Sequence, residues 1–252
     1  MNYYYNPVRT IEGAGCVGQL PDVLTKMNLT QKKVLLLVWG ETVLKHPAFA
    51  TLLGRDSGFE VYPLVFQASN PTVAQLYETY QATRSFQPEA VIAVGGGSIM
   101  DVGKSLCCLY GKDIGNVDEL RELIKNKAYG SPAARWIGIP TTAGTGSETT
   151  CWATIWDPER DAKRSVECHE NYAWAALVDP ELAAGMPLKL AVSSALDAVA
   201  HAVESYWAKG SNCVSRALAL EAVRTIMDGM EDLLAGKSVA HDAMARGSML
   251  AG

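Results

Sequence analysis

The sequence of 252 residues lacks the marks of several classes of protein. No apolar run approaches the roughly 20 residues that a membrane-spanning helix needs, so no membrane is expected as a partner. The first residues carry neither a basic segment nor an apolar stretch, which predicts no signal peptide and a cytoplasmic location. Basic residues number 22 against 27 acidic ones, and the net charge of −5 argues against a nucleic acid as partner.

Paired cysteines and clustered histidines are also missing. The six cysteines form no CxxC pair, which favours reduced thiols over a disulfide framework or a zinc site. Three of the four histidines, His46, His169 and His241, have no partner at a metal-binding spacing, and we interpret them as structural or solvated.

What the sequence does contain is an alternation of short apolar runs with helical segments. Strands are predicted at 34–39, 60–66, 90–94, 136–139 and 175–178, with helices at 47–53 and 70–86 between them. This order is typical of βαβ units, and it predicts an α/β fold with a Rossmann-like parallel sheet. Ligands of such sheets bind at the carboxyl ends of the strands.

From about Pro187 the spacing of apolar residues becomes helical. Helices are predicted at 188–207 and 214–234, and a third begins near 238. We therefore expect a dinucleotide-binding α/β domain over 1–184, followed over 185–252 by the start of an all-helical metal or substrate domain that is incomplete.

Two glycine-rich stretches are candidates for a phosphate site. Residues 93–104 run from a predicted strand through three glycines into a helical segment, which is the architecture of an anion site. The spacing before Gly103-Lys104-Ser105 does not fit a Walker A loop, and Lys104 is either a phosphate partner or an ion-pair partner of Asp101. The GxGxxG at 13–18 is rejected as a dinucleotide fingerprint, because that motif needs a buried strand before it and residues 6–12 are a poor candidate for one; a turn into a helix at 19–27 is expected.

Three further features could carry chemistry. The loop from Thr141 to Glu148 is rich in hydroxyl groups and follows a predicted strand, so it either contacts a cofactor or forms a structural turn. Asp197 and His201 lie at i and i+4 of a helix, where they either share a metal or pair with each other. Lys163 and the charges before it indicate a hairpin turn with solvated charge.

Taken in order, the motifs resemble those of the iron-containing (group III) alcohol dehydrogenases. They are Gly95-Gly96-Gly97-Ser98-x-x-Asp101-x-x-Lys104, Pro140-Thr141-Thr142-Ala143-Gly144-Thr145-Gly146-Ser147-Glu148 and Leu196-Asp197-Ala198-x-x-His201-Ala202-x-Glu204. The resemblance implies NAD(P)H as cofactor, a divalent metal (iron or zinc), a small aldehyde or alcohol as substrate, and a homodimer. It also implies a pyrophosphate side formed by Gly96, Gly97, Ser98 and Asp101, and a nicotinamide side formed by Thr141, Thr142, Thr145 and Thr150 with Asn70, Lys163 and Leu182.

The same resemblance makes Asp197 and His201 the first two metal ligands. Relatives supply two histidines after a segment like 247–252, so we expect a fragment, a partner that completes the site, or an inactive site. In that last case the chain is a nucleotide-binding module. Many relatives carry an aspartate where this chain has Gly40, which makes NADP(H) a plausible cofactor. Residues 151–157 and 204–207 resemble the branch that reduces phosphonoacetaldehyde to 2-hydroxyethylphosphonate.

Overall fold

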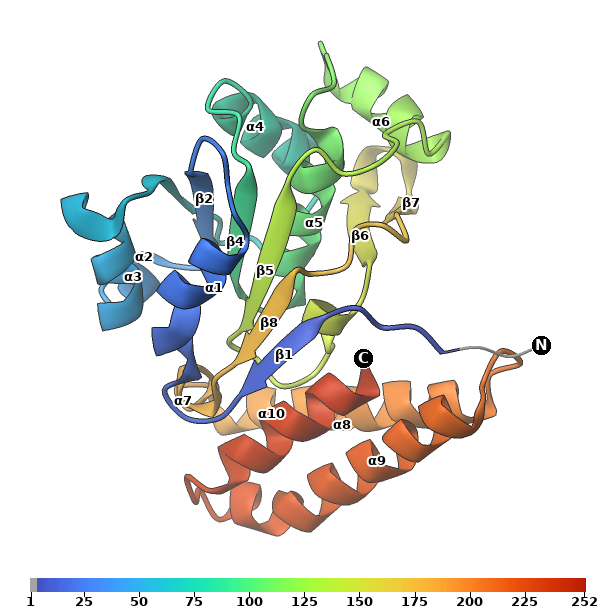
Figure 1. Ribbon diagram of the computed structural model, residues 1–252. Helices are drawn as coiled ribbons and strands as arrows, with labels where there is room; N and C mark the ends of the chain where they lie inside the picture. The colour runs from blue at the N-terminus through green and yellow to red at the C-terminus, as the bar shows by residue number, and fades with distance from the viewer. Residues whose placement is uncertain (1–3) are drawn as a thin grey trace.

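A six-stranded parallel sheet forms the centre of the computed structural model, which describes residues 4–252 (Figure 1). The expectation of no signal peptide rests in part on residues 1–3, which lie outside that range. The strand order is β1-β8-β5-β4-β2-β3. The strands are β1 (Arg9–Glu12), β2 (Lys33–Val38), β3 (Glu60–Val65), β4 (Ala90–Gly95), β5 (Arg135–Pro140) and β8 (Ala175–Val178). The predicted α/β fold with a Rossmann-like parallel sheet is confirmed.

Helices cover both faces of the sheet (Figure 1). One face carries α1 (Leu20–Lys26), α2 (Glu41–Leu44) and α3 (Pro47–Leu53), and the other carries α4 (Val73–Thr83), α5 (Gly97–Leu109) and α6 (Val117–Lys125). Successive side chains of a strand point to opposite faces, so Leu35 and Leu37 join the core under α4–α6 while Leu36 joins the core under α1 and α3. This double burial explains why the strand sequences are continuous apolar runs.

The last third of the described chain is helical. It contains α7 (Pro180–Ala183), α8 (Leu188–Trp207), α9 (Cys213–Leu234) and α10 (Ala240–Ala251). Alanines of α8 at helical spacing, Ala191, Ala195, Ala198 and Ala202, are buried against the other two long helices. These helices lie beyond the carboxyl end of β8 (Figure 1). The predicted division near 184 falls between the end of α7 and the start of α8.

No helix within residues 4–252 is long and apolar enough to cross a membrane. Six cysteines are free thiols, as the absence of a CxxC pair predicts.

One prediction about local structure is confirmed and one is wrong. Residues 9–12 form a strand, but a largely exposed edge strand that pairs with β8 alone, which agrees with the expectation that no buried strand precedes the GxGxxG stretch. The charges of the hairpin β6 (Trp152–Asp157) and β7 (Ala162–Glu167) are not all solvated. Asp157 is only 1% exposed, because Arg121 of α6 and Arg164 of β7 donate to its carboxylate.

The GxGxxG stretch has a structural explanation in this fold. Gly15 and Val17 each donate a backbone N–H to the carboxylate of Asp179, over 3.2 Å in both cases. That carboxylate satisfies the amides that a phosphate would otherwise use. The stretch then enters a short 3₁₀ turn, Cys16–Gln19, and α1, in agreement with its rejection as a cofactor fingerprint.

Candidate functional site

A cavity of about 660 Å³ opens at the carboxyl edge of the sheet. Its walls come from the ends of β2, β3, β4 and β5 and from the segment that joins α7 to α8. The lining residues are Trp39, Phe66, Gln67, Ala68, Ser69, Gly96, Gly97, Ser98, Ile99, Thr141, Thr142, Leu182, Gly185, Met186, Pro187 and Leu190. The cavity therefore lies where ligands of parallel sheets bind, between the α/β part and the helical part.

The glycine turn at the start of α5 forms one side of this cavity. Gly96 is the N-cap of α5 in an extended conformation, and the helix axis begins at Gly97. A Cβ on Gly96 would lie 3.0 Å from Thr142 Oγ1, and a Cβ on Gly97 would lie 3.1 Å from Thr145 Cγ2. Glycine is needed at both positions, because the Thr141–Thr145 loop packs directly on the turn. The positive end of the α5 dipole and the backbone of the turn thus face the cavity.

Ser98 and Asn70 meet beside the turn. The backbone N–H of Asn70 donates to Ser98 Oγ over 3.1 Å. This contact occupies an acceptor site of the hydroxyl and leaves its proton free to donate to a ligand. Asn70 has a φ of 51°, in the left-handed region, where asparagine is tolerated better than most residues.

The opposite wall of the cavity is apolar. Leu182, Met186 and Leu190 come from α7, the connection and α8, and Trp39 lies at the end of β2 with 47% of its surface exposed. An apolar wall facing a polar glycine turn suits a ligand with a flat ring and a charged linker. Trp39, Phe66, Met186 and Leu190 were not predicted; the position of Trp39 directly after a buried strand is the signal that could have found it.

The remaining predicted cofactor residues lie outside the cavity lining. Gly40 directly follows Trp39. Asp101 lies three residues before Lys104 on α5 and does not line the cavity. Thr150 Oγ1 accepts from Lys104 Nζ over 2.9 Å, and Lys163 Nζ lies 5.3 Å from the centre of the Trp156 ring.

Lys104 is neither a phosphate partner nor an ion-pair partner of Asp101. Its side chain is fully buried, and Nζ donates to Ser147 Oγ, Thr150 Oγ1 and the carbonyl of Trp152 over 2.8–2.9 Å. An ammonium group has three N–H donors, so all three are used within the protein. The sequence pattern missed this role because the acceptors lie more than 40 residues further along the chain.

Two buried ionisable groups, Lys104 and Glu148, share this region with the partly buried Asp101. Burial lowers the pKa of Lys104 to about 8, although nearby Asp101 and Glu148 oppose the shift. Burial raises the pKa of Asp101 to about 6 and that of Glu148 to about 7, while Lys104 lowers both. The ammonium of Lys104 therefore has two carboxyl groups near it, which offset only part of the cost of burying it, since its pKa remains lowered.

Asp197 and His201 lie on one face of α8. His201 Nε2 is 3.8 Å from Asp197 Oδ1, and both side chains are half-exposed. Two atoms that each lie ~2.0–2.2 Å from one ion can be at most about 4.4 Å apart, so the pair could share a divalent metal. Across the described range, however, no group of three or more His, Cys, Asp or Glu residues could hold an ion. The two donors fit one side of a metal site and do not complete it.

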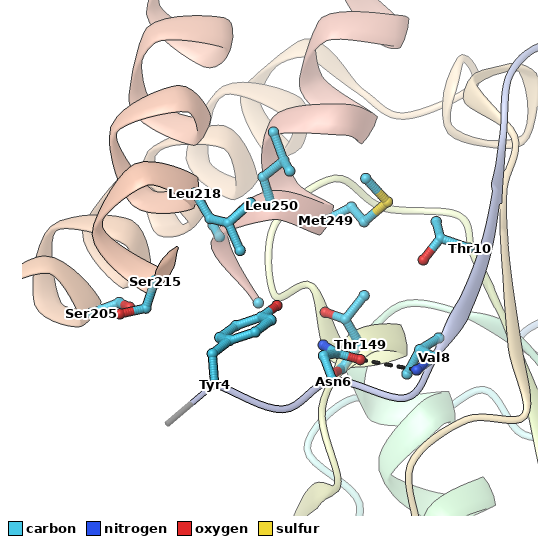
Figure 2. A pocket seen from close by; sticks show the side chains of 12 residues that line it. Tyr4, Asn6, Val8, Thr10, Thr149, Ser205, Ser215, Leu218, Met249 and Leu250 are labelled. Carbon is cyan, nitrogen blue, oxygen red and sulfur yellow. Dashed lines mark hydrogen bonds between the residues drawn. The ribbon is translucent and has the colours of Figure 1, made fainter. Parts of the chain in front are cut away.

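A second cavity, of about 240 Å³, lies between the N-terminal segment and the ends of α9 and α10 (Figure 2). Tyr4, Thr149 and Leu250 are among the residues around it, and Asn6 is fixed by a bond from its amide to the Thr149 carbonyl. The cavity holds no cluster of charged groups among its lining residues.

Comparison with known proteins agrees with this arrangement. The profile of the iron-containing alcohol dehydrogenase family matches residues 7–180, and that of the C-terminal part of the same family matches residues 191–252. An NADPH-dependent butanol dehydrogenase from Clostridium saccharobutylicum is 28% identical over 89% of this chain and 58% of its own length. An NAD-dependent methanol dehydrogenase from Bacillus methanolicus is 29% identical over 100% of this chain and 65% of its own.

Solved structures show the same fold. A sulfoacetaldehyde reductase from Bifidobacterium kashiwanohense, in complex with NAD⁺, superposes with a TM-score of 0.85 at 24% identity, over 100% of this chain and 66% of that chain. A 1,3-propanediol oxidoreductase superposes with a TM-score of 0.84 at 25% identity, over 100% of this chain and 65% of that chain. The present chain spans less than two thirds of the length of these relatives. Since two family profiles together match most of its residues, the chain belongs to the iron-containing alcohol dehydrogenase family.

Proposed function

We propose that this chain binds NAD(P)H in the cavity at the carboxyl edge of the sheet and serves the interconversion of a small aldehyde and its alcohol. The observation that carries the proposal is a glycine turn at a helix N-terminus that shares one cavity with a hydroxyl-bearing loop and an apolar wall. When bound, the dinucleotide supplies or accepts the hydride.

The residues of the chain have distinct tasks in this proposal. The backbone of Gly96 and Gly97 approaches the pyrophosphate, and the Ser98 hydroxyl donates to it. Thr141 and Thr142 orient the nicotinamide end with their hydroxyl groups, because they border the glycine turn on the side of the loop. The apolar wall excludes water from the ring that reacts, which strengthens the polar contacts inside.

Asp197 and His201 would hold one side of a divalent metal. Their carboxylate and imidazole are ligands that iron and zinc accept. Because the described residues do not supply a third donor, we assign them a binding role only and derive no step of the reaction from the metal.

Titration with NADPH and NADH, followed by the fluorescence of the reduced nicotinamide, tests binding. Turnover of short aldehydes, with phosphonoacetaldehyde among them, is then measured with added iron or zinc. Absence of binding to either dinucleotide would overturn the proposal. Binding without turnover under all metal conditions would instead support a nucleotide-binding module, the alternative that the incomplete donor set favours.

Gly40 is expected to set the preference between the two dinucleotides, since one relative is named as NADPH-dependent and another as NAD-dependent. Gly40→Asp should shift the ratio of the NADPH and NADH dissociation constants toward NADH by about tenfold or more, which is about 1.4 kcal/mol. The new carboxylate would accept from a ribose 2′-hydroxyl and repel a 2′-phosphate. The measurement is the same fluorescence titration with both dinucleotides.

The substitution fits the local backbone. Gly40 is extended, and a Cβ there would meet nothing closer than Thr42 Oγ1 at 3.9 Å. Gly40→Asn is the matched control, because it has the same shape and N-capping ability without the charge. An unchanged ratio in Gly40→Asp, or an equal change in both variants, would contradict the role of the charge.

A further inference from the structure

We propose that Lys104 is a positioning residue that holds the hydroxyl-bearing loop at the correct distance from the glycine turn, so that the nicotinamide end of the dinucleotide is aligned. The inference rests on the proposed binding of NAD(P)H. It concerns a fully buried side chain that does not line the cavity.

The geometry links one ammonium group on α5 to three acceptors of the 147–152 segment. Lys104 lies on α5, the helix that begins at the glycine turn, and its Nζ contacts Ser147, Thr150 and the first residue of β6. The Nδ2 group of Asn171 donates to the Lys104 carbonyl over 2.8 Å, which fixes the helix at the same point. One fully buried group therefore sets how the loop sits on α5.

A short series of contacts connects Lys104 to the glycine turn that lines the cavity. Ser147 Oγ accepts from Lys104, and the backbone N–H of Ser147 donates to Thr145 Oγ1 over 3.2 Å. The Thr145 side chain in turn packs closely on Gly97, where an added Cβ would lie only 3.1 Å from it. At the other end of the loop, the N–H of Thr141 donates to the Gly95 carbonyl. The loop is thus attached to the glycine turn at its start and to Lys104 at its end.

Removing the ammonium should affect one end of the ligand more than the other. Lys104→Met leaves three acceptors without donors, so the 147–152 segment is free to shift. ADP reaches the glycine turn but has no nicotinamide, whereas NADPH extends to the loop. We expect the dissociation constant of NADPH to rise about tenfold, as for a polar contact that is lost, while that of ADP stays within about twofold.

Calorimetric titration of wild type and Lys104→Met with NADPH and ADP measures both constants, and a thermal melt checks the fold. Lys127→Met is the control, because Lys127 is exposed and pairs with Glu167 at the surface. If Lys104→Met does not fold, Ser147→Ala removes one of the three acceptors, and its NADPH constant should still rise by about threefold with ADP unchanged.

The proton on Lys104 gives a second readout. A neutral amine donates two hydrogen bonds and not three, so wild-type affinity for NADPH should fall as the pH rises through about 8, and in Lys104→Met this fall should vanish. Around Nζ, burial raises the pKa of Asp101 to about 6, that of Glu148 to about 7 and that of the Cys151 thiol above its usual value, and the charge of Lys163 lowers the pKa of Asp101. Because Glu148 also titrates near pH 7, only the part of the fall that Lys104→Met removes is assigned to Lys104. Equal losses of NADPH and ADP affinity in a folded variant, or no loss, would overturn the inference. A wild-type chain that binds neither ligand would instead overturn the proposed function.

Discussion

Gly97→Val is expected to weaken NADPH binding about 100-fold, equivalent to about 2.7 kcal/mol. A Cβ at Gly97 already lies 3.1 Å from Cγ2 and Oγ1 of Thr145, and the branches of valine would push the loop away from the glycine turn. The same branches would obstruct the approach of a pyrophosphate to the backbone of α5. Fluorescence titration with NADPH measures the loss.

The GxGxxG stretch offers a matched control in the same molecule. Gly18 has open space around its Cβ position and does not line the cavity, so Gly18→Val should leave NADPH affinity within about twofold. Loss of NADPH affinity in the Gly18 variant with full affinity in the Gly97 variant would contradict the proposed site, because it would place the dinucleotide at the GxGxxG stretch. A thermal melt of each variant separates lost binding from lost fold.

Asp157→Ala is expected to lower the free energy of unfolding by about 3 kcal/mol, at the lower end of the range for a broken buried ion pair. Its carboxylate accepts from Arg121 and Arg164, whose side chains are 8% and 17% exposed. Removing this carboxylate leaves the positive charges of the two guanidinium groups close together without the negative charge between them. Arg121 keeps Asp118 and Glu159 as partners, which limits the loss. Urea denaturation followed by circular dichroism measures the change.

Glu159→Ala serves as the control for this network. Glu159 also pairs with Arg121, but 67% of its side chain is exposed, and exposed pairs contribute about 0–1 kcal/mol. Comparable destabilisation by the two substitutions would show that burial does not set the strength of the network. NADPH affinity should not change in either variant, because neither carboxylate lines the cavity.

The inner strands β2, β4, β5 and β8 were predictable because each pairs on both sides and is buried under helices; β3 is an edge strand that was predicted as well. Val34 to Val38, for example, is entirely buried, so its sequence is apolar at every position. The edge strand β1 and the helix α6 could not be found in this way. The first has one partner and exposed side chains, and the second buries Arg121, whose partner Asp157 lies 36 residues further along.

The glycine turn was predictable as an anion site because strand, turn and helix are contiguous in sequence. Only some of the residues that form the walls of the cavity could be predicted from the sequence. Trp39 lies almost 150 residues before Met186 and Leu190, and nothing in the local pattern brings them together. The same holds for Lys104, whose acceptors belong to another strand and loop. Predicted residues such as Thr150 and Asp101 lie close to this site, and their contacts with a cofactor stay a prediction.

The position of β1 in the sheet has a consequence for the order of folding. Arg9 pairs in register with Ala175, and β1 has no other partner in the sheet. During synthesis the first strand therefore leaves the ribosome long before its neighbour, and its backbone groups stay solvated until β8 has formed beside β5. The backbone amides of Gly15 and Val17 also have no acceptor until Asp179, which directly follows β8, has been synthesised. Closure of this edge is thus a late event, which joins the beginning of the chain to its helical part.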